Sequence, residues 1–510
     1  MQKHAHTSVE SEPLDASIPN NPIHVDAIVI GAGLGGLLSA AQLLQRGKKV
    51  VVVERLPHSG GRFTAKTFQG VQVSTGAVHM VPFGSSGVLA QMLRHLRIPH
   101  RFFDANVFGS FHVRGKQYRS RGLLGVYKFL GPRQFFWFTR LGYLMFLRPL
   151  PQQERSLPFH LWLERHLNVE RNPQLVAFFE CISRFALSLE LSQVSALEVV
   201  ETTKNMLRYG APAIVQGGCG ELTRHLEQHI LAQKGEIRLA CEVLQILHND
   251  GSVTGVRVRN KLNNEEVTLS APLVVSDIGP RATEALLHSR RVTQAEVLKS
   301  QATECQDASE SIHEAVGLKM HLLSDISLIP HKGIMYCLDT KRIAGIVQPT
   351  NSDPDLAPPG KHLLISHQVL QSNNIEEERE LALADLRLLF GEAFEAHCRV
   401  LTMGTYRGEW PVNRIAQGKD VLPQLFLQGL YLVGDAVKPS GYLMVEGVAQ
   451  SVNRFIDLLD DLDQEHEVAQ GNKALQRSAR SHRTRHELPP PSRVHALRWL
   501  WKAPGNSGNA

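Results

Sequence analysis

The stretch that decides the fold is "DAIVIGAGLGGLLSAAQLLQRGKKVVVVERLPHSGGR", Asp26–Arg62. The apolar run Val25–Ile30 is typical of a buried parallel strand. Apolar residues then recur at helical spacing over Leu34–Arg46, and Gly47 ends this helix because glycine readily adopts a left-handed cap. A second apolar run follows at Val50–Val53. The pattern predicts a strand–helix–strand unit with a glycine-rich turn before the helix.

The glycine-rich turn and the acid after the second strand predict a dinucleotide site. In the pattern G-x-G-x-x-G the first glycine makes a tight turn, the second lets the backbone approach a pyrophosphate, and the third permits close helix–strand packing. The helix N-terminus offers free N–H groups to phosphates. The acid can accept hydrogen bonds from ribose hydroxyls. The alternative is a glycine-rich turn that binds nothing. The cofactor-binding candidates in this segment are Gly31, Gly33, Leu34, Gly35, Gly36, Glu54 and Arg55.

The continuation "ERLPHSGGRF" separates FAD from NAD. It resembles the second glycine-rich segment of flavoproteins in the amine oxidase and phytoene dehydrogenase superfamily, in which Gly-Gly-Arg wraps the diphosphate and ribityl chain. Gly60, Gly61 and Arg62 match that segment. The glycines allow close backbone approach, and the guanidinium neutralises phosphate charge. A surface arginine is the alternative for Arg62.

Two later segments extend this resemblance. "CEVLQI" resembles the strand whose valine, here Val243, meets the adenine through its backbone. "LYLVGDAVKP" resembles the C-terminal flavin signature, which implies that Gly434 and Asp435 lie beside the ribityl chain and pyrophosphate. The helix that opens near Val445 would direct N–H groups at the flavin O2 end and so stabilise reduced flavin. The implied cofactor is FAD.

A segment at Asp353–Gly360, "DPDLAPPG", resembles phytoene dehydrogenases and related carotenoid desaturases and isomerases. The resemblance covers roughly residues 25–463. We expect the segment to be a proline-stiffened turn with a structural role. The family implies a polyisoprenoid substrate, hydride transfer to flavin N5, and quinone or oxygen as the electron acceptor.

The reaction stays open, because relatives on one scaffold desaturate, isomerise or saturate polyenes. The chain also departs from many desaturases, which read Pro-Gly-x-Gly where it has Pro439-Ser440-Gly441-Tyr442. A flavin amine oxidase is a further alternative, although DPDLAPPG argues against it. A non-enzymatic prenyl-binding protein is another, although such proteins lack the complete FAD glycine set.

Three residues are candidates for acid–base catalysis. Glu446 stands at a helix start that the resemblance places beside the flavin, although it could instead be a capping carboxylate. Lys319 lies on an alternating strand, and His79 lies in "STGAVHM", a segment that the superfamily threads beside the flavin ring. A structural role is the alternative for each. No Cys/His spacing of a zinc site is present, so we expect no metal.

The expected fold class is α/β, with a Rossmann-like FAD-binding domain and an interleaved α+β substrate domain. The FAD-binding domain is predicted from residues 25–100, 210–300 and 415–463. The substrate and membrane-associating domain is predicted from 101–209 and 301–414. Flexible tails are predicted at 1–24 and 464–510. Further elements are expected as a helix at 222–233, strands at 237–239, 243–247, 253–258, 272–278 and 315–323, and a hairpin turn at 249–251.

The expected partners are a lipophilic small molecule and a membrane surface, and not nucleic acid. Gly122–Leu150 combines eight aromatic residues with Lys128, Arg133, Arg140 and Arg148, as expected of a helix in a headgroup layer. The alternative is a helix packed on the domain core. The net charge of +6 is concentrated after residue 470, where eight Lys/Arg face one acid. Six scattered cysteines suggest a reducing compartment. We therefore expect a cytoplasmic protein, peripheral on a membrane.

Overall fold

The computed structural model describes residues 22–469 except 77, 108, 121, 288–314, 419–422 and 425–426, and the side chains of 465–469 are also left undescribed. The predictions for residues 1–21 and 470–510 lie outside the described residues.

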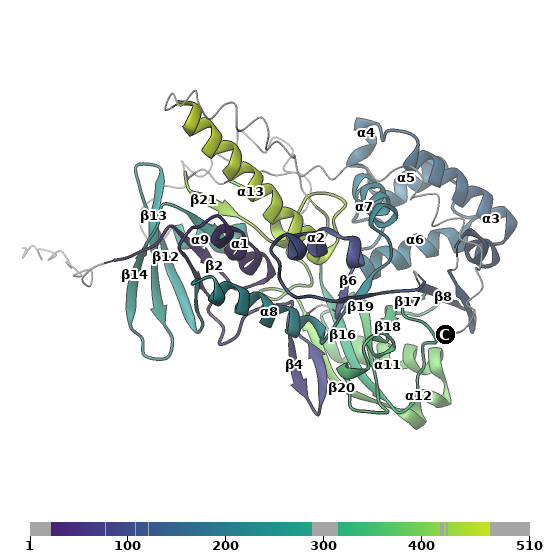
Figure 1. Cartoon of the computed structure of the whole chain (residues 1–510). Coiled ribbons are helices and arrows are strands. Elements are labelled where there is room, and N and C mark those ends of the chain that lie inside the picture. Colours follow the sequence, from purple (N-terminus) through teal and green to yellow (C-terminus); the bar gives the residue numbers. More distant parts are fainter. Residues whose placement is uncertain are drawn as a thin grey trace, which may run out of the picture.

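A five-stranded parallel sheet forms the centre of one half of the molecule (Figure 1). Every neighbouring pair in it is parallel. Its strands alternate between two cores: Val29 and Val52 pack on the helical face, whereas Ile28 and Val51 pack on the opposite face. Burial of both faces explains the continuous apolar runs. The strand order is β11 (Glu236–Arg238), β3 (Val50–Val53), β2 (Ala27–Ile30), β15 (Val274–Ser276) and β21 (Leu430–Leu432).

Helices cover one face of this sheet and a small antiparallel sheet covers the other. The helices are α1 (Leu34–Gln45), α8 (Gly218–Ala232) and α13 (Met444–Ala469). The small sheet contains β12 (Cys241–Asn249), β13 (Ser252–Asn260), β14 (Glu266–Ser270) and β1 (Ile23–His24). Asp250 and Gly251 both have positive φ at the β12–β13 turn, as the hairpin prediction requires.

A seven-stranded sheet forms the centre of the other half of the molecule. Its pairs are antiparallel except β17 with β8. Helices α11 (Ile375–Phe390) and α12 (Glu392–His397) share one apolar core with it. The strand order is β20 (Cys398–Tyr406), β16 (Gly317–Ser324), β19 (His362–Val369), β18 (Ile343–Val347), β17 (Ile334–Cys337), β8 (Gly109–Val113) and β9 (Lys116–Arg119).

A second, aromatic-rich core joins this sheet to a group of helices from the first half of the sequence. Figure 1 shows these helices gathered at the end of the molecule far from β12–β14. They are α3 (Gly122–Phe146), α4 (Gln152–Arg155), α5 (Phe159–His166), α6 (Pro173–Ala186) and α7 (Ala196–Tyr209).

The remaining described elements are short. They are β4 (Ala65–Phe68), β5 (Val71–Ser74), β6 (Met80–Val81), α2 (Val88–His95), β7 (Phe102–Asp104), β10 (Ala213–Val215), α9 (Pro280–Leu287) and the 3₁₀ turns η1 (Gly84–Ser86), η2 (Pro349–Asn351), η3 (Pro354–Leu356) and η4 (Asp435–Val437). The predicted class, a Rossmann-like sheet interleaved with an α+β unit, is therefore confirmed. The exact domain boundaries remain predictions.

The structure corrects three details of the sequence analysis. Ile23 and His24 belong to a strand paired with β14 and not to a flexible tail. Helix α13 continues to Ala469, past the expected end at 463. Helix α3 is kinked at Gly131–Pro132, where Gly131 has φ 71° and proline removes an N–H donor. None of the helices in the described part of the chain is long and apolar enough to cross a bilayer.

The DPDLAPPG segment forms a turn that braces α8. The Asp353 carboxylate accepts a hydrogen bond of 2.6 Å from the N–H of Gly217, the residue that precedes α8. Leu356 is fully buried beside Gly218. These contacts agree with the structural role expected of the segment.

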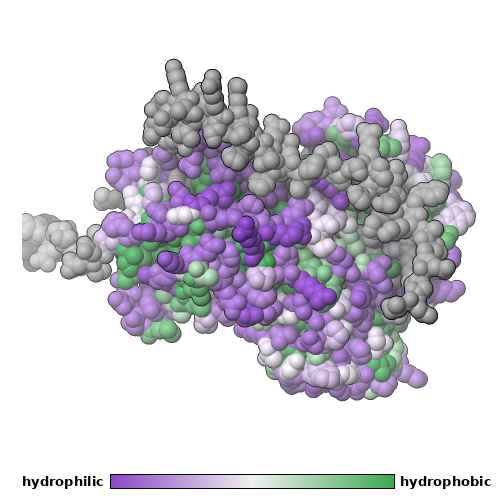
Figure 2. Space-filling model, viewed as in Figure 1, coloured by the Kyte–Doolittle hydropathy of each residue, from purple (hydrophilic) through white to green (hydrophobic). Residues whose placement is uncertain are grey.

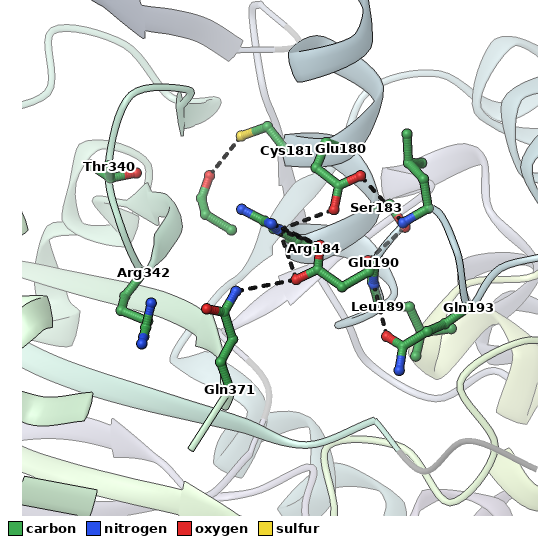
Figure 3. A network of polar contacts seen from close by, with 12 residues as sticks. Glu180, Cys181, Ser183, Arg184, Leu189, Glu190, Gln193, Thr340, Arg342 and Gln371 are labelled. Atoms are coloured by element: carbon green, nitrogen blue, oxygen red, sulfur yellow. Dashed lines mark hydrogen bonds and ion pairs between the residues drawn. The ribbon is translucent and has the colours of Figure 1, made fainter. Parts of the chain in front are cut away.

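A carboxylate pair around Arg184 joins α6 to the segment before α7 (Figure 3). The Arg184 guanidinium donates to both oxygens of Glu190 at 2.7–3.0 Å, and its Nε lies 3.1 Å from Glu180. Gln371 also donates to Glu190. Burial, together with the hydrogen bond and charge of Glu190, raises the pKa of Glu180 to about 8. Glu180 is therefore mostly protonated at neutral pH.

The raised pKa predicts a pH-dependent stability. A glutamic acid whose folded pKa is raised contributes stability that declines as the pH rises from its unfolded value toward about 8. Glu180→Gln removes that ionisation, so we expect the variant to gain about 1 kcal/mol over wild type at pH 9 but not at pH 5. Urea midpoints at both pH values measure this. Glu376→Gln, which breaks an exposed pair with Arg379, serves as the control and should show no such pH dependence. Equal changes of the urea midpoint between pH 5 and pH 9 in wild type and Glu180→Gln would contradict the raised pKa of Glu180.

Candidate functional site

A cavity of about 930 Å³ lies where the parallel strands β2, β3 and β15 end and extends to Lys319 on β16. Ligands of open parallel sheets bind at this edge. Most of the predicted cofactor residues line it: Gly31, Gly33, Leu34, Gly35, Glu54, Arg55, Gly60, Gly61, Arg62, Val243, Asp435 and Val445. Gly36 and Gly434 are not among the lining residues.

The glycine loop holds α1 close to the end of β2. Gly31 has φ +97°, a conformation that favours glycine. A Cβ at Gly36 would overlap the carbonyl oxygen of Gly31, so this glycine serves helix–strand packing as predicted. The second glycine segment packs onto the first, because Gly60 N donates to Ala32 O at 2.7 Å. We call these two glycine segments, Gly31–Gly36 and Gly60–Gly61, the cradle, and it consists largely of backbone.

Glu54 ties the cradle together at the tip of β3. Its carboxylate oxygens accept hydrogen bonds from Ala32 N at 2.7 Å and Leu56 N at 2.8 Å. It lines the cavity, so its remaining acceptor capacity faces the expected ribose position. Arg55 lies at the exposed rim and is 3.5 Å from Glu409.

Two arginines flank a buried aspartate at the centre of the cavity wall. The Asp435 carboxylate lies 2.8 Å from the guanidinium of Arg62 and 3.1 Å from that of Arg414. Arg414 also donates its backbone N–H to Asp435 at 2.7 Å. Burial alone would raise the pKa of Asp435, but the two arginines hold it below its ordinary value. Asp435 thus fixes two cations beside the cradle.

Arg414 and Asp277 were missed in the sequence analysis. Arg414 belongs to the loop 408–415, which lines the cavity but contains no recognisable motif. Asp277 follows β15 directly, as Glu54 follows β3, so its position after an apolar strand was an available signal. Its carboxylate accepts from Gly36 N at 3.0 Å, at the start of α1.

The start of β12 lines the cavity beside the tip of β3. Cys241 N donates to Glu54 O at 2.8 Å, which joins β12 to the tip of β3. Cys241, Glu242 and Val243 all line the cavity there. Backbone groups of this strand are therefore available to an adenine, as the resemblance implies for Val243.

Lys319 is the catalytic candidate that reaches the cavity. Its Nζ donates to Gly76 O and lies 4.8 Å from the centroid of the Tyr406 ring. Burial lowers the pKa of Lys319 to about 7, so a large fraction of the amine is neutral at physiological pH. A neutral amine can accept a proton.

Glu446 and His79 contact backbone groups, in agreement with the structural alternative for each. The Glu446 carboxylate accepts from Leu89 N at 2.9 Å and Phe83 N at 3.3 Å, so it caps α2, and burial raises its pKa to about 7. Both ring nitrogens of His79 are engaged, with Gln72 O at 2.7 Å and Cys219 N at 3.1 Å. Burial lowers the pKa of His79 to about 4. Neither residue lines the cavity.

The cavity fits a dinucleotide diphosphate by the chemistry of its donors. The N-terminus of α1, which has no acid in its first turn, opens onto it beside the guanidinium groups of Arg62 and Arg414. Helix N-termini and arginine forks both favour phosphate.

Removal of one arginine should weaken cofactor binding. We expect Arg414→Ala to raise the dissociation constant for FAD about tenfold or more, because charged hydrogen bonds contribute about 1.5–3 kcal/mol. Quenching of FAD fluorescence during titration measures this. Arg407→Ala, an exposed arginine outside the lining, is the control. If Arg414→Ala kept the wild-type affinity for FAD, the Arg414 guanidinium would bind Asp435 but not the cofactor.

Comparisons with known proteins agree with this geometry. An uncharacterized protein of Methanocaldococcus jannaschii is 31% identical over 446 residues, which cover 85% of this chain and 99% of that protein. The crystal structure of an oxidoreductase from Methanosarcina mazei is 32% identical, with a TM-score of 0.75 over 85% of this chain and 100% of the other.

Two carotenoid enzymes match about half of the chain. Phytoene desaturase (neurosporene-forming) of Rhodobacter capsulatus is 27% identical over 280 residues, 49% of this chain and 52% of that enzyme. Prolycopene isomerase of Daucus carota is 25% identical over 274 residues, 46% of this chain and 44% of that enzyme.

The family model for flavin containing amine oxidoreductases matches residues 34–454. This span runs from the start of α1 into α13 and so includes nearly every segment that lines the cavity. The chain therefore belongs to the family of flavin-containing amine oxidoreductases, with FAD as its cofactor.

Proposed function

We propose that the chain is a polyene oxidoreductase that transfers a hydride between a polyisoprenoid or carotenoid substrate and N5 of FAD. The observation that carries the substrate class is the outer face of α3, where apolar and basic side chains stand together in solvent. The DPDLAPPG turn and the two carotenoid relatives support the same class. FAD supplies a two-electron acceptor, and the residues of the chain bind it, exclude water and handle the proton.

The cavity residues divide these tasks. The cradle around Gly33, Arg62 and Asp435 would hold the diphosphate end of FAD. Lys319 lies on the second sheet, at a buried position in the same cavity wall. Removal of a hydride from one carbon of a saturated bond must be matched by loss of a proton from its neighbour. A neutral Lys319 Nζ is placed to receive that proton.

The experiment that tests the substrate class is expression in hosts that accumulate phytoene, lycopene or their cis isomers. We expect a change of pigment in at least one host, and its absorption separates desaturation, isomerisation and saturation. Unchanged pigments in every host, with FAD bound, would contradict the proposal.

Lys319 variants test the proton transfer. We expect Lys319→Met to retain FAD but to lose about 100-fold in conversion rate, the usual contribution of a positioned acid or base. Lys319→Arg should lose activity as well, because a guanidinium does not deprotonate near pH 7. Restored activity in the arginine variant would instead assign Lys319 a purely electrostatic role.

Amine oxidation is the second candidate. Trp410 lines the cavity, and the Tyr406 ring lies beside Lys319 Nζ, so aromatic groups are available to a cationic substrate. Peroxide release with amines, in the absence of any pigment change, would favour this function.

The second part of α3 presents one exposed face with the composition of a membrane-surface helix. Arg133, Phe136, Arg140, Tyr143 and Leu147 follow one another at spacings of three and four, and all are exposed. Phe136 and Leu147 are 61% and 74% exposed, so this face presents large apolar side chains to solvent between two arginines. Figure 2 shows one face of the molecule, which is largely hydrophilic with hydrophobic residues in small groups. We propose that this face rests on anionic lipid, as a peripheral cytoplasmic enzyme with an insoluble substrate requires.

Liposome sedimentation tests this surface. We expect Phe136→Glu with Leu147→Glu to reduce binding to vesicles of phosphatidylcholine and phosphatidylglycerol about tenfold or more at low salt, since each apolar side chain contributes about 1.5–3 kcal/mol on burial. The control is Leu262→Glu, which alters a side chain 84% exposed in the β13–β14 turn of the other half of the molecule. Equal sedimentation of the double variant and wild type would place the membrane contact elsewhere or remove it.

A further inference from the structure

A carboxylate shares the cradle in which the diphosphate of FAD would lie. Oδ2 of Asp277 accepts a hydrogen bond of 3.0 Å from Gly36 N, one of the free N–H groups at the start of α1. A Cβ at Gly35 would stand 2.6 Å from Oδ1 of Asp277, and a Cβ at Gly33 or Gly434 would overlap its carboxylate. The glycines that allow the backbone to approach a phosphate thus surround the Asp277 side chain.

The position of Asp277 is fixed by the sheet. It follows β15 directly, and its own N–H donates to Ile30 O at 2.9 Å, at the end of β2. The side chain is therefore directed across the end of β2 toward the N-terminus of α1. Such a carboxylate occupies the position that suits an anion.

The charged groups that face Asp277 come from three segments. Arg414 and Arg62 attract its charge, whereas Asp435 repels it. Helix α1 contributes backbone N–H groups but no acidic or basic side chain in its first turn. Desolvation by the surrounding protein raises the pKa of Asp277 to about 7. At neutral pH the Asp277 carboxyl group is therefore near its own pKa, so that one added negative charge nearby changes its protonation state.

We propose that Asp277 takes up a proton when FAD binds, so that the affinity for FAD falls as the pH rises. The two arginines are already matched by Asp435 and an ionised Asp277. A diphosphate brings two further negative charges, and these stay ionised throughout the neutral range. Two anions in one desolvated cradle repel each other, whereas a protonated Asp277 can donate its hydrogen to a phosphate oxygen. The proton comes from solvent, and no bond to the cofactor forms or breaks.

The proposal rests on FAD occupying this cavity and is independent of the substrate. Failure of the polyene assignment would leave it intact. If neither wild type nor variant binds FAD at any pH, both the placement of the cofactor and this proposal are lost.

The test is a pH series of FAD titrations on the full-length chain freed of flavin. For wild type we expect a constant dissociation constant below about pH 6 and a rise of up to about tenfold per pH unit between pH 7 and 9, the limit for uptake of one proton. Asp277→Asn keeps the shape but does not ionise, so its dissociation constant should change less than about twofold over that range. Glu376→Gln removes an exposed carboxylate outside the cavity lining and should keep the slope of wild type.

Calorimetry on wild type alone provides a second readout that does not depend on a variant folding. Titration of FAD at pH 8 in buffers of different ionisation enthalpy counts the protons taken up. We expect close to one proton per FAD for wild type and close to none for Asp277→Asn. No uptake by wild type, or the same pH slope in wild type and Asp277→Asn, would overturn the proposal.

Discussion

The rest of the structure depends on the close approach of the α1 N-terminus to the carboxyl ends of β2, β3 and β15. Three conditions produce it: a left-handed turn at Gly31, direct contact of Gly36 with the carbonyl of Gly31, and the bond from Gly60 to Ala32. A Cβ at Gly36 would overlap the carbonyl oxygen of Gly31 and separate α1 from β2, and a Cβ at Gly60 would overlap Thr64. The first N–H groups of α1 have no backbone partners within the helix, as at any helix N-terminus. In the cavity, Asp277 accepts a hydrogen bond from one of those groups, and a phosphate could accept from others.

Buried charge follows from the same constraint. Arg62 and Arg414 are held within the cavity wall, where an unpaired guanidinium would be costly, and Asp435 satisfies both. Asp435 in turn precedes the segment that leads into α13, so the cation pair is fixed to the central sheet by β21 and to the loop 408–415 by Arg414. Segments from the beginning and the end of the chain must therefore come together before the site is complete. This explains why the cavity residues are spread from Ile30 to Val448.

Local sequence predicted those parts of the site in which the chemistry lies in the backbone. β3 was predicted with its observed bounds and α1 to within one residue, because apolar runs and glycine caps act within a few residues. The glycines and Glu54 were recognised for the same reason. Arg414 was not, because its role arises from a contact with Asp435 that no local pattern encodes. The α3 kink was missed although Gly131–Pro132 stood in the sequence, since the aromatic run alone was taken as the signal. Tertiary pairing likewise turned Ile23–His24 from tail into strand.

The three catalytic candidates are equally buried but differ in the groups that they contact. All three are buried and all have pKa values moved toward the neutral form. Glu446 faces the unpaired N–H groups of α2, and His79 bridges a carbonyl and an amide, so the bonding capacity of each is directed at backbone that would otherwise lack partners. Lys319 has a single carbonyl partner, retains two further donors or a lone pair, and lies in the cavity wall. The shifted pKa values therefore reflect burial in all three residues. Only Lys319 has remaining hydrogen-bonding capacity in the cavity wall, and this favours it over Glu446 and His79 as the acid–base candidate.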